Sequence, residues 1–244
     1  MIYLLISDSA FFEKLNNEQK RDCRTVRQPL NLLPEEIKAF INDTKNEVTK
    51  KERALAYTSL LSGLHLFYDI GDATLKKDQH GKPFLVTKSG EIYLKNDREI
   101  HINISHSEGV SAVCISNEGK IGVDIQAEIE AQRAERLEKR FFMNLNLQNK
   151  PIDMRIFACD INDEAASFVE VELDSVGDVD FTAKWAYAES LMKLYGRGFG
   201  DLSMINNEGK CDELSSGKVN LQKIKTNILS YKTNKNYTIA VSIM

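Results

Sequence analysis

Residues 181–198 read FTAKWAYAESLMKLYGRG. This run predicts a strong helix that ends at Gly196, because glycine is favoured just past a helix C-terminus and Arg197 places a basic residue beside it. Strand-like segments follow at Ile228–Lys232 and Tyr237–Ile243, joined by a short polar turn. The second half of the chain is therefore expected to contain a helix and then strands.

The first half shows the same order of elements. Residues Lys50–Tyr68 carry apolar side chains at mixed three- and four-residue steps and no proline, which predicts a largely buried helix ended by Gly71. Further on, Val110–Ile115 and Ile121–Ile125 are typical of strands. We expect those two strands to pair as a hairpin across the turn at 117–119. The order of a helix and then glycine-punctuated strands thus appears twice.

Other stretches give simpler expectations. The apolar run Met1–Ile6 predicts a first strand, since it lacks a basic flank and is too short for a signal peptide or a membrane span. A helical turn is expected after Pro34, and residues 127–150 are helix-like with one polar face. Residues 156–183 contain eight acidic side chains and no lysine or arginine, and we interpret them as a solvated connection.

Composition and charge exclude several kinds of protein. The chain has 244 residues, of which 42% are hydrophobic, and this allows one core or two smaller ones. A formal charge of −4 gives no general positive field, so we expect neither nucleic acid nor a membrane as a partner. The four cysteines have no C-x-x-C spacing, which argues against a zinc site or a disulfide framework and favours a cytoplasmic location.

Acidic and basic side chains recur at spacings that could serve a metal. Asp124 and Gln126 lie two apart in a strand-like run, so both should emerge on the face opposite their apolar neighbours. Glu189 and Lys193 lie one helical turn apart and share a face. Singly, each has an ordinary structural explanation, as a strand-end acid or an exposed ion pair. Together, acids on a strand and a helix with cations nearby are suited to holding Mg²⁺ against a pyrophosphate.

Two short stretches could serve a phosphate group. Ser105–Ser107 (SHS) follows an alternating segment, where a strand would end, and an imidazole with hydroxyls suits a phosphate. A lone histidine is, however, more often a local hydrogen-bonding group. Gly81–Pro83 (GKP) supplies a turn with one lysine and carries no signal alone. Trp185, the only tryptophan, is expected to pack in a core.

Four blocks, in this order and spacing, resemble the 4′-phosphopantetheinyl transferase superfamily, and more narrowly its larger, surfactin-synthetase-activating type. They are Gly81–Phe84 (GKPF), Asn103–Ser107 (NISHS), Gly122–Ile125 (GVDI) and Trp185–Gly198 (WxxxESxxKxxGxG). Lys139–Phe142 and the strand pair after Ile228 also fall where that family has similar segments. The resemblance covers roughly residues 50–244.

The resemblance implies a pseudo-dimeric α+β fold with two similar lobes, each with a long helix packed on an antiparallel sheet. Residues 1–125 would form a lobe that binds the nucleotide of coenzyme A, and residues 126–244 a lobe with the metal-binding helix and sheet. One chain would then build a complete site, so we expect a monomer. The implied reaction is Mg²⁺-dependent transfer of 4′-phosphopantetheine from coenzyme A to a serine of an apo acyl or peptidyl carrier protein, with release of 3′,5′-adenosine bisphosphate.

Residue roles are implied by position. Asp124, Gln126 and Glu189 would ligate Mg²⁺. Glu189 would also accept the proton of the carrier serine, directly or through water, and Lys193 would neutralise the leaving bisphosphate. The coenzyme A site would comprise Arg53, Lys82, Pro83, Ser105 and His106. For the 3′-phosphate, Lys50, Lys51 and Arg24 are alternatives to Arg53.

Two departures from the family pattern matter. A third acid is usual two residues after the strand aspartate, and here Gln126 offers an amide oxygen without charge. A lysine is usual just before the helix glutamate, and here the residue is Ala188, with Lys184 one turn earlier. One alternative is therefore a coenzyme A-binding protein of the same fold with little or no transferase activity. Another is an unrelated α+β enzyme that uses a nucleotide.

Overall fold

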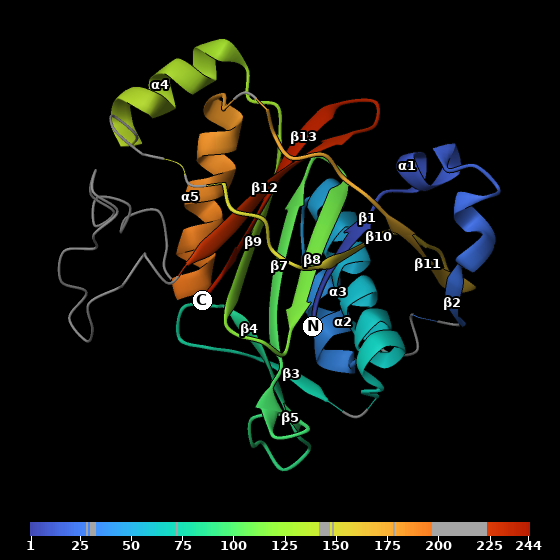
Figure 1. The fold of residues 1–244 in the computed structure, drawn as a ribbon. Coiled ribbons are helices and arrows are strands. Elements are labelled where there is room, and N and C mark those ends of the chain that lie inside the picture. Colours follow the sequence, from blue (N-terminus) through green and yellow to red (C-terminus); the bar gives the residue numbers. More distant parts are fainter. Residues whose placement is uncertain are drawn as a thin grey trace.

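The structure, a computed structural model, has a mixed α+β architecture (Figure 1). It describes residues 1–27, 29, 33–71, 73–141, 147, 149–177, 179–196 and 224–244. Among the helices in these ranges, none is long and apolar enough to cross a membrane. Parts of the expected Trp185–Gly198 and Lys139–Phe142 blocks, Arg197, Gly198 and Phe142, lie outside the described residues.

The larger sheet has six strands in the order β2-β11-β10-β1-β8-β7. Its strands are β2 (Arg24–Arg27), β11 (Ala165–Val171), β10 (Arg155–Ile161), β1 (Ile2–Ser7), β8 (Val110–Ser116) and β7 (His101–Ser107). The expected first strand is confirmed, and it runs parallel to β10 and antiparallel to β8. Helix α3 (Glu47–Tyr68) packs against β1, β7 and β8 and ends at Asp69, two residues before the expected Gly71.

The smaller sheet has the order β12-β13-β9, with β12 Lys225–Lys232, β13 Asn236–Ile243 and β9 Ile121–Ala127. Helix α5 (Phe181–Tyr195) packs against β9 and β13. It begins after Asp180, whose side chain accepts a hydrogen bond from the Ala183 N–H, and ends at Gly196 in the left-handed conformation, with φ of 65°. The predicted helix and its glycine end are confirmed, as are the two C-terminal strands.

The layers follow from where the apolar side chains point. One core lies between α3 and the larger sheet, where Leu60 and Leu64 meet Leu5. A second lies between the two sheets, where alternate residues of β1 and β8 face β9, β12 and β13. A third lies under α5. The order of layers is thus α3, larger sheet, smaller sheet, α5.

One order of elements occurs twice in the chain. The elements β1, α3, β7 and β8 precede β9, α5, β12 and β13, and the strand orders are β1-β8-β7 and β9-β13-β12. In each unit the first strand pairs antiparallel with the last. The expected boundary between residues 125 and 126 falls inside β9, which pairs with β13 along its whole length. The division into two lobes at that point stays a prediction.

Shorter elements complete the described chain. They are α1 (Ser9–Lys14), the 3-10 helix at Gln19–Asp22, α2 (Glu35–Asn42), β3 (Thr74–Lys77), β4 (Pro83–Val86), β5 (Leu94–Lys95), β6 (Arg98–Glu99) and α4 (Ala131–Phe141). The start of α2 after Pro34 agrees with the sequence, as does a helix inside 127–150. Cys114 and Cys159 are buried free thiols, and Cys23 is an exposed one.

Two expectations are wrong. The strands at Val110–Ser116 and Ile121–Ala127 form, but they do not pair as a hairpin, because β8 lies between β1 and β7 while β9 pairs with β13. The turn at 117–119 therefore connects two sheets. The tract 156–183 is not simply a solvated connection, since β10 and β11 lie in it and Phe157 and Phe168 are buried. The charge of the whole tract hides the alternation of apolar residues along these strands.

Candidate functional site

The two sheets are joined where β7 lies beside β9. Alternate side chains of one strand point to the same face, so three polar residues of β7 reach the neighbouring backbone. The backbone N–H groups of Val123, Ile125 and Ala127 donate to the side-chain oxygens of Asn103, Ser105 and Ser107, at 2.8, 3.2 and 3.1 Å respectively. These side-chain bonds fix the register between the two sheets.

Asp124 lies on β9 within this junction and is only 3% exposed. Its Oδ1 accepts hydrogen bonds from the Ser105 hydroxyl at 2.8 Å and from Lys193 Nζ at 2.7 Å. Its Oδ2 is buried and receives no N–H or hydroxyl hydrogen bond from the described residues, whereas a protonated Glu189 carboxyl lies within hydrogen-bond reach of the Asp124 side chain. Because a buried carboxylate oxygen without a donor is costly, this atom is suited to a ligand that supplies positive charge.

Helix α5 brings two further charged side chains to Asp124. Its close approach depends on Gly122, where a Cβ would lie 2.0 Å from a backbone oxygen of α5. Lys193 Nζ lies 2.8 Å from Ser105 Oγ, to which it donates, and 3.7 Å from Glu189 Oε2. One ammonium therefore lies between two carboxylates that come from different elements.

Glu189 has a strongly perturbed proton affinity. Burial, and then the negative charge of Asp124, raise the pKa of its carboxyl to about 7, although Lys193 and a hydrogen bond from Trp185 act in the opposite direction. The Trp185 Nε1–H donates to Glu189 Oε1 at 2.9 Å. A carboxyl that titrates near neutrality can exchange protons with a substrate at physiological pH.

Gln126 lies on the expected face of β9 but not in the hydrogen-bonded cluster. Asp124 and Gln126 alternate with Val123 and Ile125, which are buried in the core between the sheets. The Gln126 Nε2–H donates to the Ala127 carbonyl at 3.1 Å. In the described ranges, no three His, Cys, Asp or Glu side chains are grouped to hold a metal. A cation here would have two carboxylates and, at most, a neutral amide.

Ser105 and His106 face opposite sides of β7. His106 Nδ1 lies 2.7 Å from Glu52 Oε2 on α3, while Ser105 faces β9. Glu52 is 4% exposed, and its Oε1 also accepts the Gly109 N–H at 2.6 Å. Glu52 was not predicted from the sequence. Its position as a lone acid within the apolar face of a helix could have indicated a buried, paired side chain.

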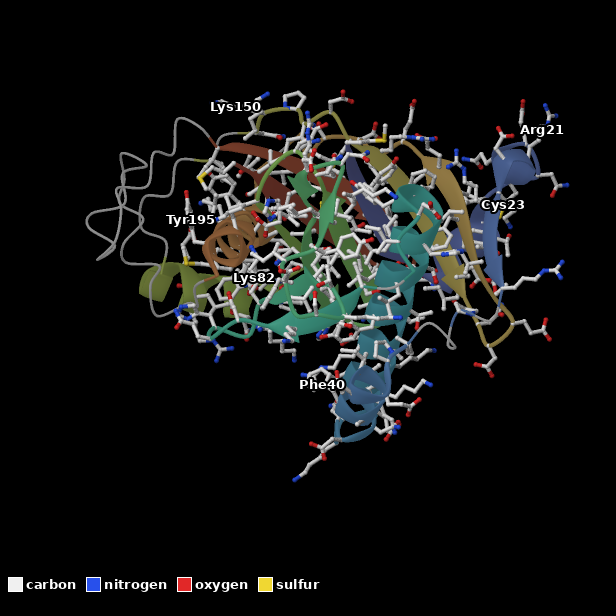
Figure 2. All side chains as sticks on the ribbon, turned by 90° about the horizontal axis from the view of Figure 1, so that it is seen from below. Arg21, Cys23, Phe40, Lys82, Lys150 and Tyr195 are labelled. Carbon is white, nitrogen blue, oxygen red and sulfur yellow. The ribbon has the colours of Figure 1, made fainter. Side chains whose placement is uncertain are left out.

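Lys82 contacts backbone oxygens at the end of α5. Its Nζ donates to the carbonyls of Ile121 and Leu194 at 3.0 and 3.1 Å. Figure 2 shows Lys82 close to Tyr195 at the end of that helix. Burial, and then the charge of Lys120, lower the pKa of Lys82 to about 8. In this arrangement Lys82 ties the turn before β4, which Pro83 begins, to both α5 and β9.

Arg53 lies against α2. Its Nη1 donates to Thr44 Oγ1 at 2.8 Å, and its guanidinium carbon lies 4.6 Å from the centroid of the Phe40 ring. Lys77 Nζ lies 3.6 Å from the same centroid, and burial, then Arg53, lower the pKa of Lys77. Phe40 is partly buried against the core of the first unit, on the helix that extends from the body of the molecule in Figure 2. Arg53 therefore belongs to a separate cationic group, together with Lys77.

The surroundings of Glu189 account for the one departure from the family pattern that lies on α5. Ala188 is fully buried, and Lys184 pairs with Glu138 of α4 at 2.9 Å rather than with the cluster. Trp185 is half-buried rather than part of the buried core, and its indole N–H donates to Glu189. The four-residue spacing between the two was the signal for that bond, since side chains so spaced are neighbours on a helix.

The chain matches no protein-family model and no curated protein. A functional assignment therefore depends on the residues of the chain itself and on their arrangement.

Proposed function

We propose that the chain is a Mg²⁺-dependent 4′-phosphopantetheinyl transferase that modifies a serine of an apo carrier protein. The observation that carries the proposal is the cluster of Ser105, Asp124, Glu189 and Lys193. These residues come from three of the four family-like blocks, and they meet at one buried carboxylate. Such convergence of distant segments is what a shared site for coenzyme A and a metal requires.

The carboxylates fit a divalent cation. Asp124 Oδ2 is buried without a hydrogen bond from an N–H or hydroxyl group of the described residues, and burial, then the negative charge of Asp124, raises the pKa of Glu189. Added positive charge would therefore stabilise both ionised carboxylates. Asp124 and Glu189 would hold Mg²⁺, and Gln126 would offer a neutral oxygen. When bound, the ion would supply charge neutralisation for the pyrophosphate of coenzyme A.

The remaining steps belong to the side chains. Glu189 would accept the proton of the attacking serine, directly or through water, because its carboxylate lies beside the cation position in the cluster. Lys193 would place its ammonium beside the pyrophosphate, where negative charge develops as the adenosine bisphosphate leaves. Ser105 would orient Asp124, and Trp185 would orient Glu189, through the hydrogen bonds already described.

The repeated order of elements supports the two-lobed, pseudo-dimeric arrangement that the resemblance implies. In this proposal the site lies between the units, at the β7–β9 junction, and one chain contributes every residue of the cluster. We accordingly propose a cytoplasmic monomer. Arg53 and Lys77 would meet the nucleotide end, whereas Lys82 and His106 would have to exchange their present partners to reach a phosphate.

A direct assay tests the proposal. The protein is incubated with coenzyme A, Mg²⁺ and a panel of apo acyl and peptidyl carrier proteins, each also incubated with a reference transferase. Intact-mass spectrometry should show the gain of one phosphopantetheine group on at least one carrier. Glu189→Gln should abolish the gain, and Glu138→Gln, on the neighbouring α4, should not. The proposal is contradicted if the protein leaves unmodified every carrier that the reference enzyme modifies.

A coenzyme A-binding protein of the same fold is the second candidate. The neutral Gln126 and the buried Ala188 favour it, since both remove charge that the family pattern places at the site. Calorimetry separates the two functions. A pure binder would take up coenzyme A without modifying any carrier, and its affinity would be insensitive to Asp124→Asn.

A further inference from the structure

The ammonium of Lys193 is the nearest positive charge to both carboxylates of the cluster. It donates to Asp124 Oδ1 at 2.7 Å and lies 3.7 Å from Glu189 Oε2. The side chain of Asp124 is 4% exposed and that of Lys193 is 27% exposed. The lysine therefore reaches from the edge of the site into it, and its charge lies where two acids would otherwise repel each other.

We propose that Lys193 is an internal counterion that holds the cation position between Asp124 and Glu189 and has to withdraw when a divalent cation binds. This rests on the cation site of the proposed function but not on the transfer reaction. The ammonium contacts Asp124 Oδ1, and a divalent ion held by the same two carboxylates through Asp124 Oδ2 and Glu189 would lie close to it, so the two positive charges would repel at short range. Lysine is suited to such exchange, because its ammonium sits on a flexible four-carbon stem.

The cluster would keep its form after the ammonium withdraws. The Ser105 hydroxyl donates to Asp124 Oδ1 and accepts the Ile125 N–H, so the carboxylate stays oriented without Lys193. Trp185 likewise keeps its bond to Glu189 Oε1. Withdrawal of Lys193 thus leaves the described hydrogen bonds that orient Asp124 and Glu189 in place.

Replacement of the ammonium by the cation gives the Lys193 side chain two positions, and it has a different role in each. Before the cation binds, the lysine limits repulsion between the two acids. After the cation binds, the displaced ammonium is available to a phosphate-bearing ligand at the edge of the site. Binding of the divalent ion and of a pyrophosphate should therefore favour each other, since each compensates for the charge that the other brings.

The experiment measures Mn²⁺ binding to the full chain at about pH 8, without coenzyme A or carrier, from the paramagnetic resonance signal of free Mn²⁺. Lys193→Met should bind Mn²⁺ at least about tenfold more tightly than the parent, because a charge-assisted hydrogen bond no longer has to be broken. Lys184→Met removes an ion-paired lysine from the same helix and should match the parent. Asp124→Asn, added to Lys193→Met, should abolish the gain.

The control variants keep the outcome decisive. Lys193→Gln serves if the methionine variant does not fold by circular dichroism, and Lys193→Arg, which retains the charge, should not tighten binding. Equal or weaker Mn²⁺ binding in the neutral variants overturns the proposal, as does the absence of binding in every variant. Because no coenzyme A is present, failure of the transfer assay would leave this result standing.

Discussion

The two helix-and-sheet units each carry a glutamate on the inner face of their long helix, and the two differ in burial and in their partners: Glu52 is buried, whereas Glu189 is half-buried. Glu52 of α3 receives the His106 imidazole and the Gly109 N–H. Glu189 of α5 receives one indole N–H and lies 3.7 Å from an ammonium, and burial, then the negative charge of Asp124, raises its pKa to about 7. A buried acid with full local compensation holds a fold together, whereas one left short of positive charge is available to a ligand.

The largest expected effect is a loss of transferase activity when an acid of the Asp124–Glu189 cluster is replaced. Asp124→Ala and Glu189→Ala should each lower the turnover of carrier modification at least about a hundredfold, because each removes a metal ligand or a base. Both proteins should remain folded by circular dichroism. If either variant kept near-parental turnover at saturating carrier and coenzyme A, that acid would not serve the reaction.

The next effect concerns stability in the first unit. Glu52→Ala should lower the free energy of unfolding by roughly 2–4 kcal/mol, since it removes a buried acceptor and leaves the Gly109 N–H and His106 without their partner. Urea unfolding measures the change. As a matched control, Glu47→Ala, at the exposed start of the same helix, should cost much less. If Glu52→Ala lowers the free energy of unfolding no more than Glu47→Ala does, the hydrogen bonds of Glu52 do not stabilise the fold as described.

The third effect uses pH to separate the same two residues. The folded-state pKa of Glu189 is raised, so its protonated form favours folding below the unfolded pKa near 4.5, and that contribution is lost as pH rises through about 7. Glu189→Gln cannot ionise. Its thermal stability relative to the parent should therefore increase between about pH 5 and pH 8, by roughly 1–3 kcal/mol. A difference that does not change over this range would contradict the raised pKa.

The smallest effect sharpens the account of the cation site. Gln126→Glu should lower the Mg²⁺ concentration needed for half-maximal activity, because a third negative oxygen ligand strengthens attraction to a hard cation. Initial rates are measured against Mg²⁺ at fixed ionic strength and fixed coenzyme A. An unchanged or higher requirement would place residue 126 away from the metal.

Local signals predicted the elements of the fold well. The helix at Phe181–Tyr195 follows from its glycine end, and β12 and β13 follow from alternation, since both signals lie within a few residues. Strand pairing was not predictable in the same way. β8 takes its second partner from β1, at the other end of the first unit, and that pairing depends on the packing of the two sheets rather than on the turn beside it.

The site was predictable where spacing alone decides which side chains meet. Glu189 and Lys193 share a helical face by their four-residue spacing, and Asp124 emerges opposite its apolar neighbours by strand alternation. The hydroxyl bonds of Ser105, the pairing of His106 with Glu52 and the carbonyl contacts of Lys82 depend on partners far away in the chain. Those contacts determine which side chains already have a hydrogen-bond partner, and they form only in the folded chain.

The central claim is that Asp124 and Glu189 hold a divalent cation against coenzyme A at the junction of the two units. Crystals grown with Mn²⁺ and coenzyme A, with anomalous diffraction recorded for manganese, test it most directly. The account predicts a manganese peak in contact with Asp124 Oδ2, the Glu189 carboxylate and the pyrophosphate. A manganese ion held elsewhere, or coenzyme A bound away from the β7–β9 junction, would contradict it.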